Sequence, residues 1–194
     1  MKRNLKIKRG KINLGRNFVI TLFICVLSIL LKIIMLVLNL NGIYVQGTNF
    51  SQDTIDLIIN TVILLSVTTI IMYKLKDKTL KTFTVICSTF LIVSNFCWWL
   101  LIDSDTAYTT FYSPSRNEAF VVKETRHSEV YQLLKFKLLS KKLVDIRGDD
   151  GYRMFYEDNY KLEWMNQNKL KIHYLFDPIS PKDYKNVTVT YKEY

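Results

Sequence analysis

The chain has 194 residues, of which 49% are apolar and 23% charged, and its formal net charge is +10. The apolar residues gather in the first half of the chain, whereas a single globular core needs them spread throughout. The excess positive charge lies beside these apolar runs, so it does not indicate a nucleic-acid-binding face on a folded domain.

Three apolar runs each approach the ~20 residues that a helix needs to cross a hydrocarbon layer. They span 17–40, 54–73 and 82–102 and predict three transmembrane helices in a membrane domain over 17–102. The first run exceeds the hydrophobic region of a signal peptide, and no small-residue cleavage site follows it, so we interpret it as a retained anchor.

The basic residues predict how the helices are oriented. Segment 1–16 carries seven lysines and arginines, and loop 74–81 carries four lysines against Asp77, whereas segment 41–53 has no basic residue. Short basic loops stay in the cytoplasm. The pattern therefore predicts a multi-pass protein of the cell membrane, with a basic cytoplasmic tail over 1–16 and an extracytoplasmic domain over 103–194. The tail can also contact anionic lipid of the bilayer.

A lysine lies inside the first span, at position 32. An ionised side chain costs at least ~2.5 kcal/mol at mid-helix, so Lys32 is a candidate functional residue. Two alternatives remain: the long side chain snorkels toward the outer headgroups, or it pairs with Asp56 at the start of the second span. Trp98 and Trp99, near the outer end of the third span, are interpreted as membrane-interface residues.

After position 108 the sequence takes on the pattern of a β domain. Short runs rich in β-branched and aromatic residues are separated by turn residues, and the predicted strands lie in 118–124, 129–139, 159–164, 169–174 and 186–193. Runs 159–164 and 169–174 alternate apolar with polar residues and predict a hairpin with one buried face. Trp164 is on that face, so we interpret it as a core residue. The predicted fold class is three transmembrane helices followed by a small, mostly antiparallel β domain.

The best candidate binding residues are Asp149, Asp150 and Tyr152, in the motif Asp-Asp-Gly-Tyr. The motif is typical of a turn in which Gly151 takes a positive φ. Its acids could also hold calcium, but the spacing of a twelve-residue calcium loop is absent.

The sequence has few residues suited to metal binding or catalysis. Its histidines are His127 and His173, and the three cysteines, Cys25, Cys87 and Cys97, all fall within the apolar runs. No nucleophile elbow, phosphate loop or zinc-protease motif is present. We therefore assign no catalytic residue, no metal ligand and no cofactor from the sequence.

The stretches "FYSPSRNEAFVVKE", "DDGYRMFYEDNYKLEW" and "KLKIHY" resemble an uncharacterised family of small envelope proteins from Gram-positive bacteria related to bacilli. Members are membrane-anchored or lipoprotein-like and carry Ser-Pro and Asp-Asp-Gly-Tyr motifs in a C-terminal β domain. The resemblance covers 111–174 and implies an exported domain with no established activity. This chain departs from the simplest members because it has three spans in place of one anchor.

The sequence favours a non-enzymatic membrane protein whose outer β domain binds an envelope protein or a wall component. A membrane sensor or an immunity-type protective protein is the alternative, and it requires two states with different ligand contacts. An envelope hydrolase is a third possibility. It would require Asp149, Asp150, Glu157 or His173 to converge in a cleft.

Overall fold

The computed structural model describes residues 2–46, 51–103, 105–135, 138–165, 168–180 and 182–193. The chain forms two compact units. The helical unit comprises Met1–Val37 and Asp53–Leu101, and the β unit comprises Leu38–Gln52 and Ile102–Tyr194. Three long helices followed by an antiparallel β domain confirm the predicted fold class.

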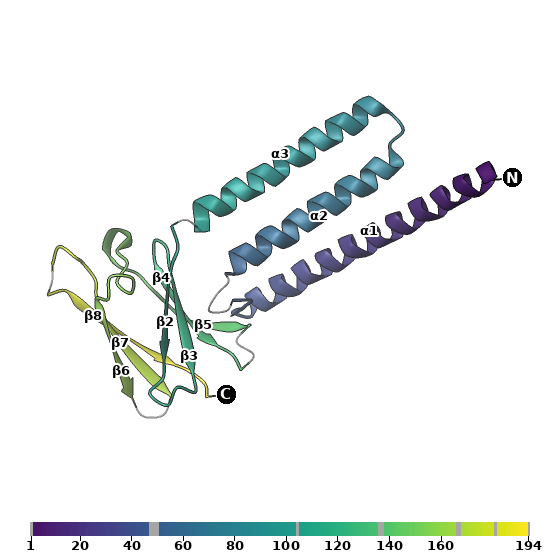
Figure 1. Ribbon diagram of the computed structural model, residues 1–194. Coiled ribbons are helices and arrows are strands. Elements are labelled where there is room, and N and C mark those ends of the chain that lie inside the picture. Colours follow the sequence, from purple (N-terminus) through teal and green to yellow (C-terminus); the bar gives the residue numbers. More distant parts are fainter. Residues whose placement is uncertain are drawn as a thin grey trace. The chain divides into compact units, whose positions relative to one another are not determined.

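The helices are α1 (Lys2–Leu40), α2 (Gln52–Lys74) and α3 (Lys78–Asp103), shown in Figure 1. Each contains a stretch long and apolar enough to cross a membrane, namely Gly15–Leu40, Gln52–Lys74 and Lys78–Leu101. This is the layout of a membrane protein with three candidate spans. Helix α1 begins well before the predicted span, because the basic tail has no proline and is rich in Lys and Arg, which favour helix.

Consecutive helices run antiparallel (Figure 1), and individual side chains link them. The rings of Phe18 in α1 and Tyr73 in α2 lie 5.6 Å apart, edge to face. Thr68 Oγ1 in α2 lies 2.6 Å from Ser88 Oγ in α3, and Asn95 Nδ2 donates to Thr61 Oγ1 at 3.4 Å. Polar side chains thus join α2 to α3, a common use of such residues between transmembrane helices.

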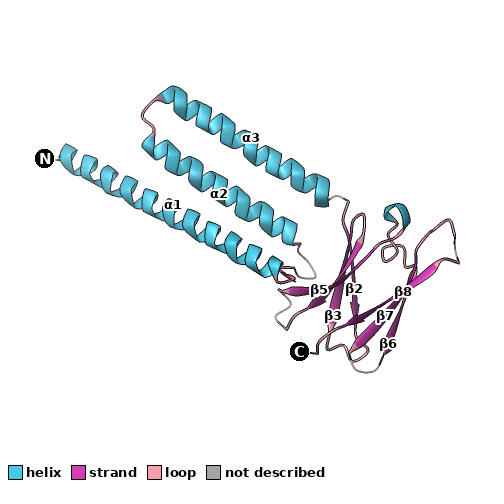
Figure 2. Ribbon diagram, turned by 180° about the vertical axis from the view of Figure 1, so that it is seen from behind, coloured by secondary structure: helices cyan, strands magenta, loops and turns pink. Residues whose placement is uncertain are grey.

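The β unit contains two antiparallel sheets, seen from behind in Figure 2. The larger sheet has the strand order β1-β5-β4-β3-β2, and the smaller has the order β6-β7-β8. Their strands are β1 (Ile43–Tyr44), β2 (Ala107–Tyr112), β3 (Ala119–Glu124), β4 (Ser128–Leu133), β5 (Ser140–Ile146), β6 (Tyr160–Met165), β7 (Lys169–Leu175) and β8 (Tyr184–Thr190).

One hydrophobic core joins the two sheets. Side chains from all strands from β2 to β8 contribute to it, and Phe120, Leu170 and Ile172 are completely buried. The predicted hairpin is present as β6 and β7, with Trp164 directly opposite Leu170. The Trp164 ring packs against Phe120 at 5.6 Å, which confirms that it is a core residue.

Three strands were not predicted from the sequence. β1 has two residues, too few to show a periodicity, and it lies between α1 and α2 in the chain. It pairs with β5, about a hundred residues later, with Ile43 opposite Lys141. β2 and β5 were also missed, and the run 129–139 is not one strand. β4 ends at Leu133, Leu134 N donates to Leu139 O at 2.7 Å, and β5 begins at Ser140; residues 136–137 of the predicted run lie outside the described residues.

Candidate functional site

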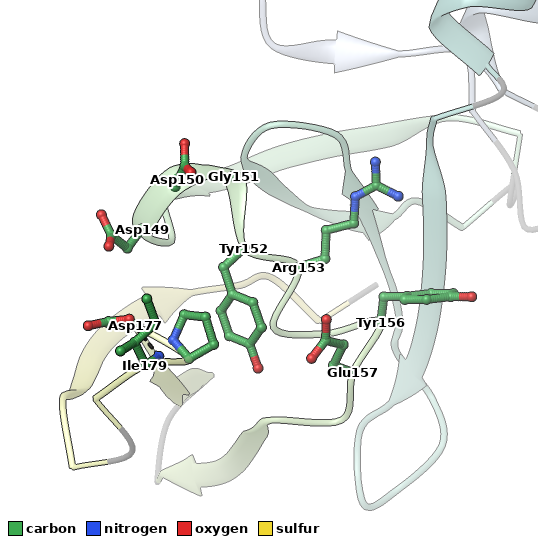
Figure 3. A pocket seen from close by; sticks show the side chains of 10 residues that line it. Asp149, Asp150, Gly151, Tyr152, Arg153, Tyr156, Glu157, Asp177 and Ile179 are labelled. Carbon is green, nitrogen blue, oxygen red and sulfur yellow. Dashed lines mark hydrogen bonds between the residues drawn. The ribbon is translucent and has the colours of Figure 1, made fainter.

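A pocket of about 480 Å³ opens at one end of the β unit (Figure 3). Two segments form it, the chain between β5 and β6 and the loop between β7 and β8. They are held together by a 2.8 Å hydrogen bond from Asp149 N to Phe176 O. The lining residues are Asp149, Asp150, Gly151, Tyr152, Arg153, Tyr156, Glu157, Asp177, Pro178 and Ile179. The pocket therefore contains all three candidate binding residues from the sequence.

The Asp-Asp-Gly-Tyr motif forms the tight turn that was predicted. Asp149–Gly151 is a short 3-10 helix, closed by a 2.9 Å hydrogen bond from Tyr152 N to the carbonyl oxygen of Asp149. Gly151 has φ of 74° and Asp150 has φ of 44°, conformations that glycine and aspartate tolerate better than most residues. A Cβ at Gly148 would lie 2.7 Å from Tyr152 O, so only glycine fits immediately before the turn.

A buried carboxylate supports the wall of the pocket. The Glu124 side chain is 0% exposed and accepts hydrogen bonds from Phe155 N at 3.0 Å and Tyr156 N at 2.6 Å. Ser128 Oγ also donates to it at 2.7 Å. Glu124 thus satisfies two backbone groups of the turn that carries Tyr156, since buried N–H groups need partners. The sequence offered one sign of this role: an acid at the end of a buried strand.

The Tyr152 hydroxyl lies within the pocket among polar groups. It accepts a hydrogen bond from Asn159 Nδ2. Burial raises the pKa of Tyr152; the Asn159 bond acts in the opposite direction, and the nearby Glu157 carboxylate raises the pKa further. The hydroxyl therefore stays protonated at neutral pH and can donate a hydrogen bond.

Carboxylates dominate the charge of the pocket. Asp149, Asp150, Glu157 and Asp177 are acids, whereas Arg153 is the one base among the described lining residues. The Arg153 guanidinium contacts the carbonyl oxygen of Asp105 at 2.6 Å and also forms an ion pair with the Asp105 carboxylate. Since Arg153 is engaged in this way, the pocket presents a net negative surface.

Two of the residues that line the pocket are largely apolar and exposed. Tyr156 is 68% exposed and Ile179 is 89% exposed. Apolar groups this exposed, beside several carboxylates, suit a ligand that carries a positive charge next to an apolar part. The aromatic faces of Tyr152 and Tyr156 can themselves attract a cation.

The envelope-hydrolase alternative requires Asp149, Asp150, Glu157 or His173 to converge in one cleft, and the structure brings only the three acids into one pocket. Asp149, Asp150 and Glu157 line the pocket. His173 points to the exposed face of the smaller sheet, where its Nε2 lies 2.9 Å from Glu163 Oε2. His127 also lies outside the pocket, before β4 and near Glu129. Among the described lining residues there is thus no histidine to act with the acids.

In the helical unit, Lys32 Nζ lies 2.7 Å from Asp56 Oδ1, so the lysine of α1 pairs with the aspartate of α2 as the second alternative expected. Trp99 Nε1 donates to Thr54 Oγ1 at 3.4 Å, whereas the Trp98 side chain is largely exposed. The three cysteines are free thiols.

Comparisons with protein families, curated proteins and solved structures find no match to this chain. The resemblance to bacterial envelope proteins therefore stays a prediction.

Proposed function

We propose that this chain is a membrane-anchored binding protein whose β domain faces the outside of the cell membrane. Its pocket takes a positively charged group presented by an envelope protein or a wall component. The observation that carries the proposal is the acidic pocket around Tyr152, with two exposed apolar groups in its lining.

The basic residues support this orientation, and the pairing of β1 with β5 supports the three-span topology. Lysines and arginines crowd the start of α1 and the α2–α3 loop, as in segments that stay in the cytoplasm. Strand β1, from the α1–α2 loop, pairs with β5 of the β domain. With α1, α2 and α3 spanning, that loop and the β domain have to share a compartment, opposite the basic segments.

The ligand class follows from the charges of the pocket. Four carboxylates with one engaged arginine favour a cation over an anion, and a cleft lined by one sign of charge raises the local concentration of the opposite sign. A lysine or arginine side chain of a protein carries such a cation beside a methylene chain, and so does an amino group on a wall component. The methylene chain would contact Ile179 and Tyr156.

The binding test uses the full chain in nanodiscs, incubated with envelope extract. We expect the protein to capture a partner that the variant Asp150→Asn with Glu157→Gln no longer retains, and capture to weaken with salt. The variant Glu163→Gln removes a carboxylate from the exposed face of the smaller sheet and serves as the matched control. Equal capture by all three proteins would refute the pocket as the binding site.

The orientation test uses a chain in which the three native cysteines are replaced. Cysteine at position 179 is expected to react with a membrane-impermeant maleimide on intact cells, whereas cysteine at position 76 in the α2–α3 loop should react only after lysis. The reverse pattern would place the β domain in the cytoplasm.

A membrane sensor is the second candidate function, and the Lys32–Asp56 ion pair favours it. Ionisable residues inside spans are costly and commonly functional. This pair joins α1 to α2, the two helices that flank β1 in the chain. In a sensor, Lys32→Leu would abolish the response to the ligand at an unchanged protein level in the membrane, and an unchanged response would exclude this role.

A further inference from the structure

A second polar cluster lies on the larger sheet, separate from the pocket. His127 directly precedes β4, Glu129 is in β4, and Asp145 is in β5. Glu129 and Asp145 are directly opposite each other in the antiparallel ladder. Like charges in this position repel and destabilise a sheet unless a cation lies between them. The ladder therefore creates a place that favours a cation.

A β-bulge brings a lysine to the same place. Val130 pairs with Val144 and the next residue, Tyr131, pairs with Lys142, so one residue of β5 is left over. Side chains three residues apart on a regular strand point to opposite faces, but the bulge turns Lys142 toward the face of Asp145. Lys142 Nζ contacts Glu129 Oε1 and lies 3.6 Å from Asp145 Oδ2.

Several charged and polar neighbours interact with the Glu129 carboxylate. Burial alone would raise the pKa of Glu129, but hydrogen bonds from Lys142 and Tyr131 outweigh burial and lower it. Lys123 of β3, directly opposite Glu129, acts in the same direction. For Lys142, burial lowers the pKa, but the Glu129 carboxylate outweighs it and the pKa is raised. Glu129 and Lys142 thus form a close ion pair within the cluster.

The distances within the cluster fit a metal ion. His127 Nε2 lies 3.7 Å from Glu129 Oε1 and 3.8 Å from Asp145 Oδ1, and all three atoms lie within 4.8 Å of one another. A zinc ion about 2.0–2.2 Å from each of four tetrahedral ligands holds them roughly 3.3–3.6 Å apart. Both contacts of the imidazole nitrogen are slightly longer than this, so small side-chain rotations would bring the three ligand atoms around one ion.

We propose that His127 Nε2, Glu129 Oε1 and Asp145 Oδ1 form a site for a divalent transition metal such as Zn²⁺, for which the Lys142 ammonium competes. The imidazole distinguishes the cluster from a calcium site, because Ca²⁺ takes six to eight oxygen ligands. The side chains of all three ligands are partly exposed, so a water molecule can reach the fourth position.

Charge balance explains why the two cations exclude each other. Two carboxylates with the Lys142 ammonium sum to −1, and the same carboxylates with Zn²⁺ and a neutral imidazole sum to zero. Zn²⁺ and the ammonium together would leave +1 beside Lys123, and both would bind Glu129 Oε1. When the metal binds, the Lys142 side chain therefore has to swing away, which its long flexible stem permits.

The test measures Zn²⁺ and Co²⁺ binding to the full chain in detergent, after chelator treatment and without a histidine tag. Isothermal titration gives the affinity for Zn²⁺, and the visible absorption of Co²⁺ reports the ligand set. We expect Lys142→Met to bind Zn²⁺ about tenfold more tightly than the natural chain. Adding His127→Ala to Lys142→Met should abolish binding, because one imidazole supplies the nitrogen ligand.

His173 provides the matched control, since it is also partly exposed and lies beside a single carboxylate, Glu163. His173→Ala in the Lys142→Met background should leave Zn²⁺ binding unchanged. Thermal unfolding verifies folding, and Zn²⁺ should raise the unfolding temperature only in variants that keep His127. The proposal fails if Lys142→Met binds no Zn²⁺, binds it no more tightly than the natural chain, or binds it equally without His127. The site does not depend on the proposed function of the pocket.

Discussion

The ring of Tyr44, from the loop between α1 and α2, packs edge-on against the ring of Tyr131 in the middle of the β unit, with the ring centroids 5.2 Å apart. The contact accompanies the pairing of β1 with β5. Edge-to-face aromatic pairs contribute roughly 0.5–1.5 kcal/mol beyond the apolar area that they bury. A two-residue strand is thus held by its side chain as well as by its backbone.

Cysteines placed across β1 and β5 should form a disulfide. In a chain that lacks its three native cysteines, Ile43→Cys with Lys141→Cys places two thiols at directly opposite positions, within the reach of a disulfide. We expect mild oxidation to link β1 to β5, seen as a shifted band on a non-reducing gel. The control pair, Ile43→Cys with Ile179→Cys, should stay reduced; equal cross-linking of both pairs would contradict the register.

Either substitution that breaks the Lys32–Asp56 ion pair, Lys32→Leu or Asp56→Leu, should destabilise the helical unit. Each single variant should lose more stability than the double variant. Lys32→Leu leaves a carboxylate without its cation among apolar groups, and Asp56→Leu leaves the lysine without its partner. We expect a coupling of about 1 kcal/mol in a double-mutant cycle, measured by unfolding in detergent. Strictly additive effects would mean that each residue contacts headgroups instead of the other.

Glu124→Gln should destabilise the β unit by about 1–3 kcal/mol. An amide replaces one of the two accepting oxygens, so the N–H of Phe155 or Tyr156 loses its acceptor in a buried place. Thermal unfolding gives the loss of stability, and hydrogen exchange at these two amides locates it. Glu163→Gln, at an exposed carboxylate, should change neither the stability nor the hydrogen exchange of these amides. An equal loss of stability in both variants would contradict the stabilising role of the buried Glu124 carboxylate.

The β unit should lose stability at alkaline pH. Burial is the main cause that raises the pKa of Tyr152, Tyr160, Tyr174 and Tyr191 in the folded chain. When the folded pKa of a group exceeds its unfolded value, its stabilisation is complete below the unfolded pKa, about 10 for tyrosine, and declines as pH rises toward the folded pKa.

Urea unfolding at pH 9 and pH 11, with tyrosine ionisation followed by absorbance, checks this expectation. Tyr160→Phe should reduce the loss of stability between the two pH values, because phenylalanine does not ionise. Tyr156→Phe, which changes an exposed ring, is the control. A loss of the same size in the Tyr160→Phe variant would assign the pH dependence to other groups.

The long periodic segments could be predicted from the sequence. Helices of more than twenty residues that are mostly apolar carry a strong signal. The strict alternation around Trp164 does so too, because one face of this strand packs against the core. The strand β5 was missed because its bulge interrupts the alternation that marks a strand. β1 was missed because nothing within two residues indicates a partner about a hundred positions away.

The candidate site was predicted only in part. Asp149, Asp150 and Tyr152 are adjacent in the chain and carry the signature of a turn, so local reasoning found them. Asp177 and Ile179 reach the same pocket from the β7–β8 loop, and only the folded structure brings the two loops together. The same explanation applies to His127, Glu129 and Asp145. Their proximity depends on the register of β4 and β5, and a single sequence does not specify that register.

The origin of β1 decides how the β unit should be produced for experiments. A fragment that starts after α3 would omit this strand and leave the backbone of β5 uncovered, with Tyr131 missing its aromatic neighbour. Unpaired edges of this kind recruit other chains and promote aggregation. A soluble version should therefore carry residues 38–46 joined to residue 105 through a flexible linker, so that β1 is kept and can pair with β5.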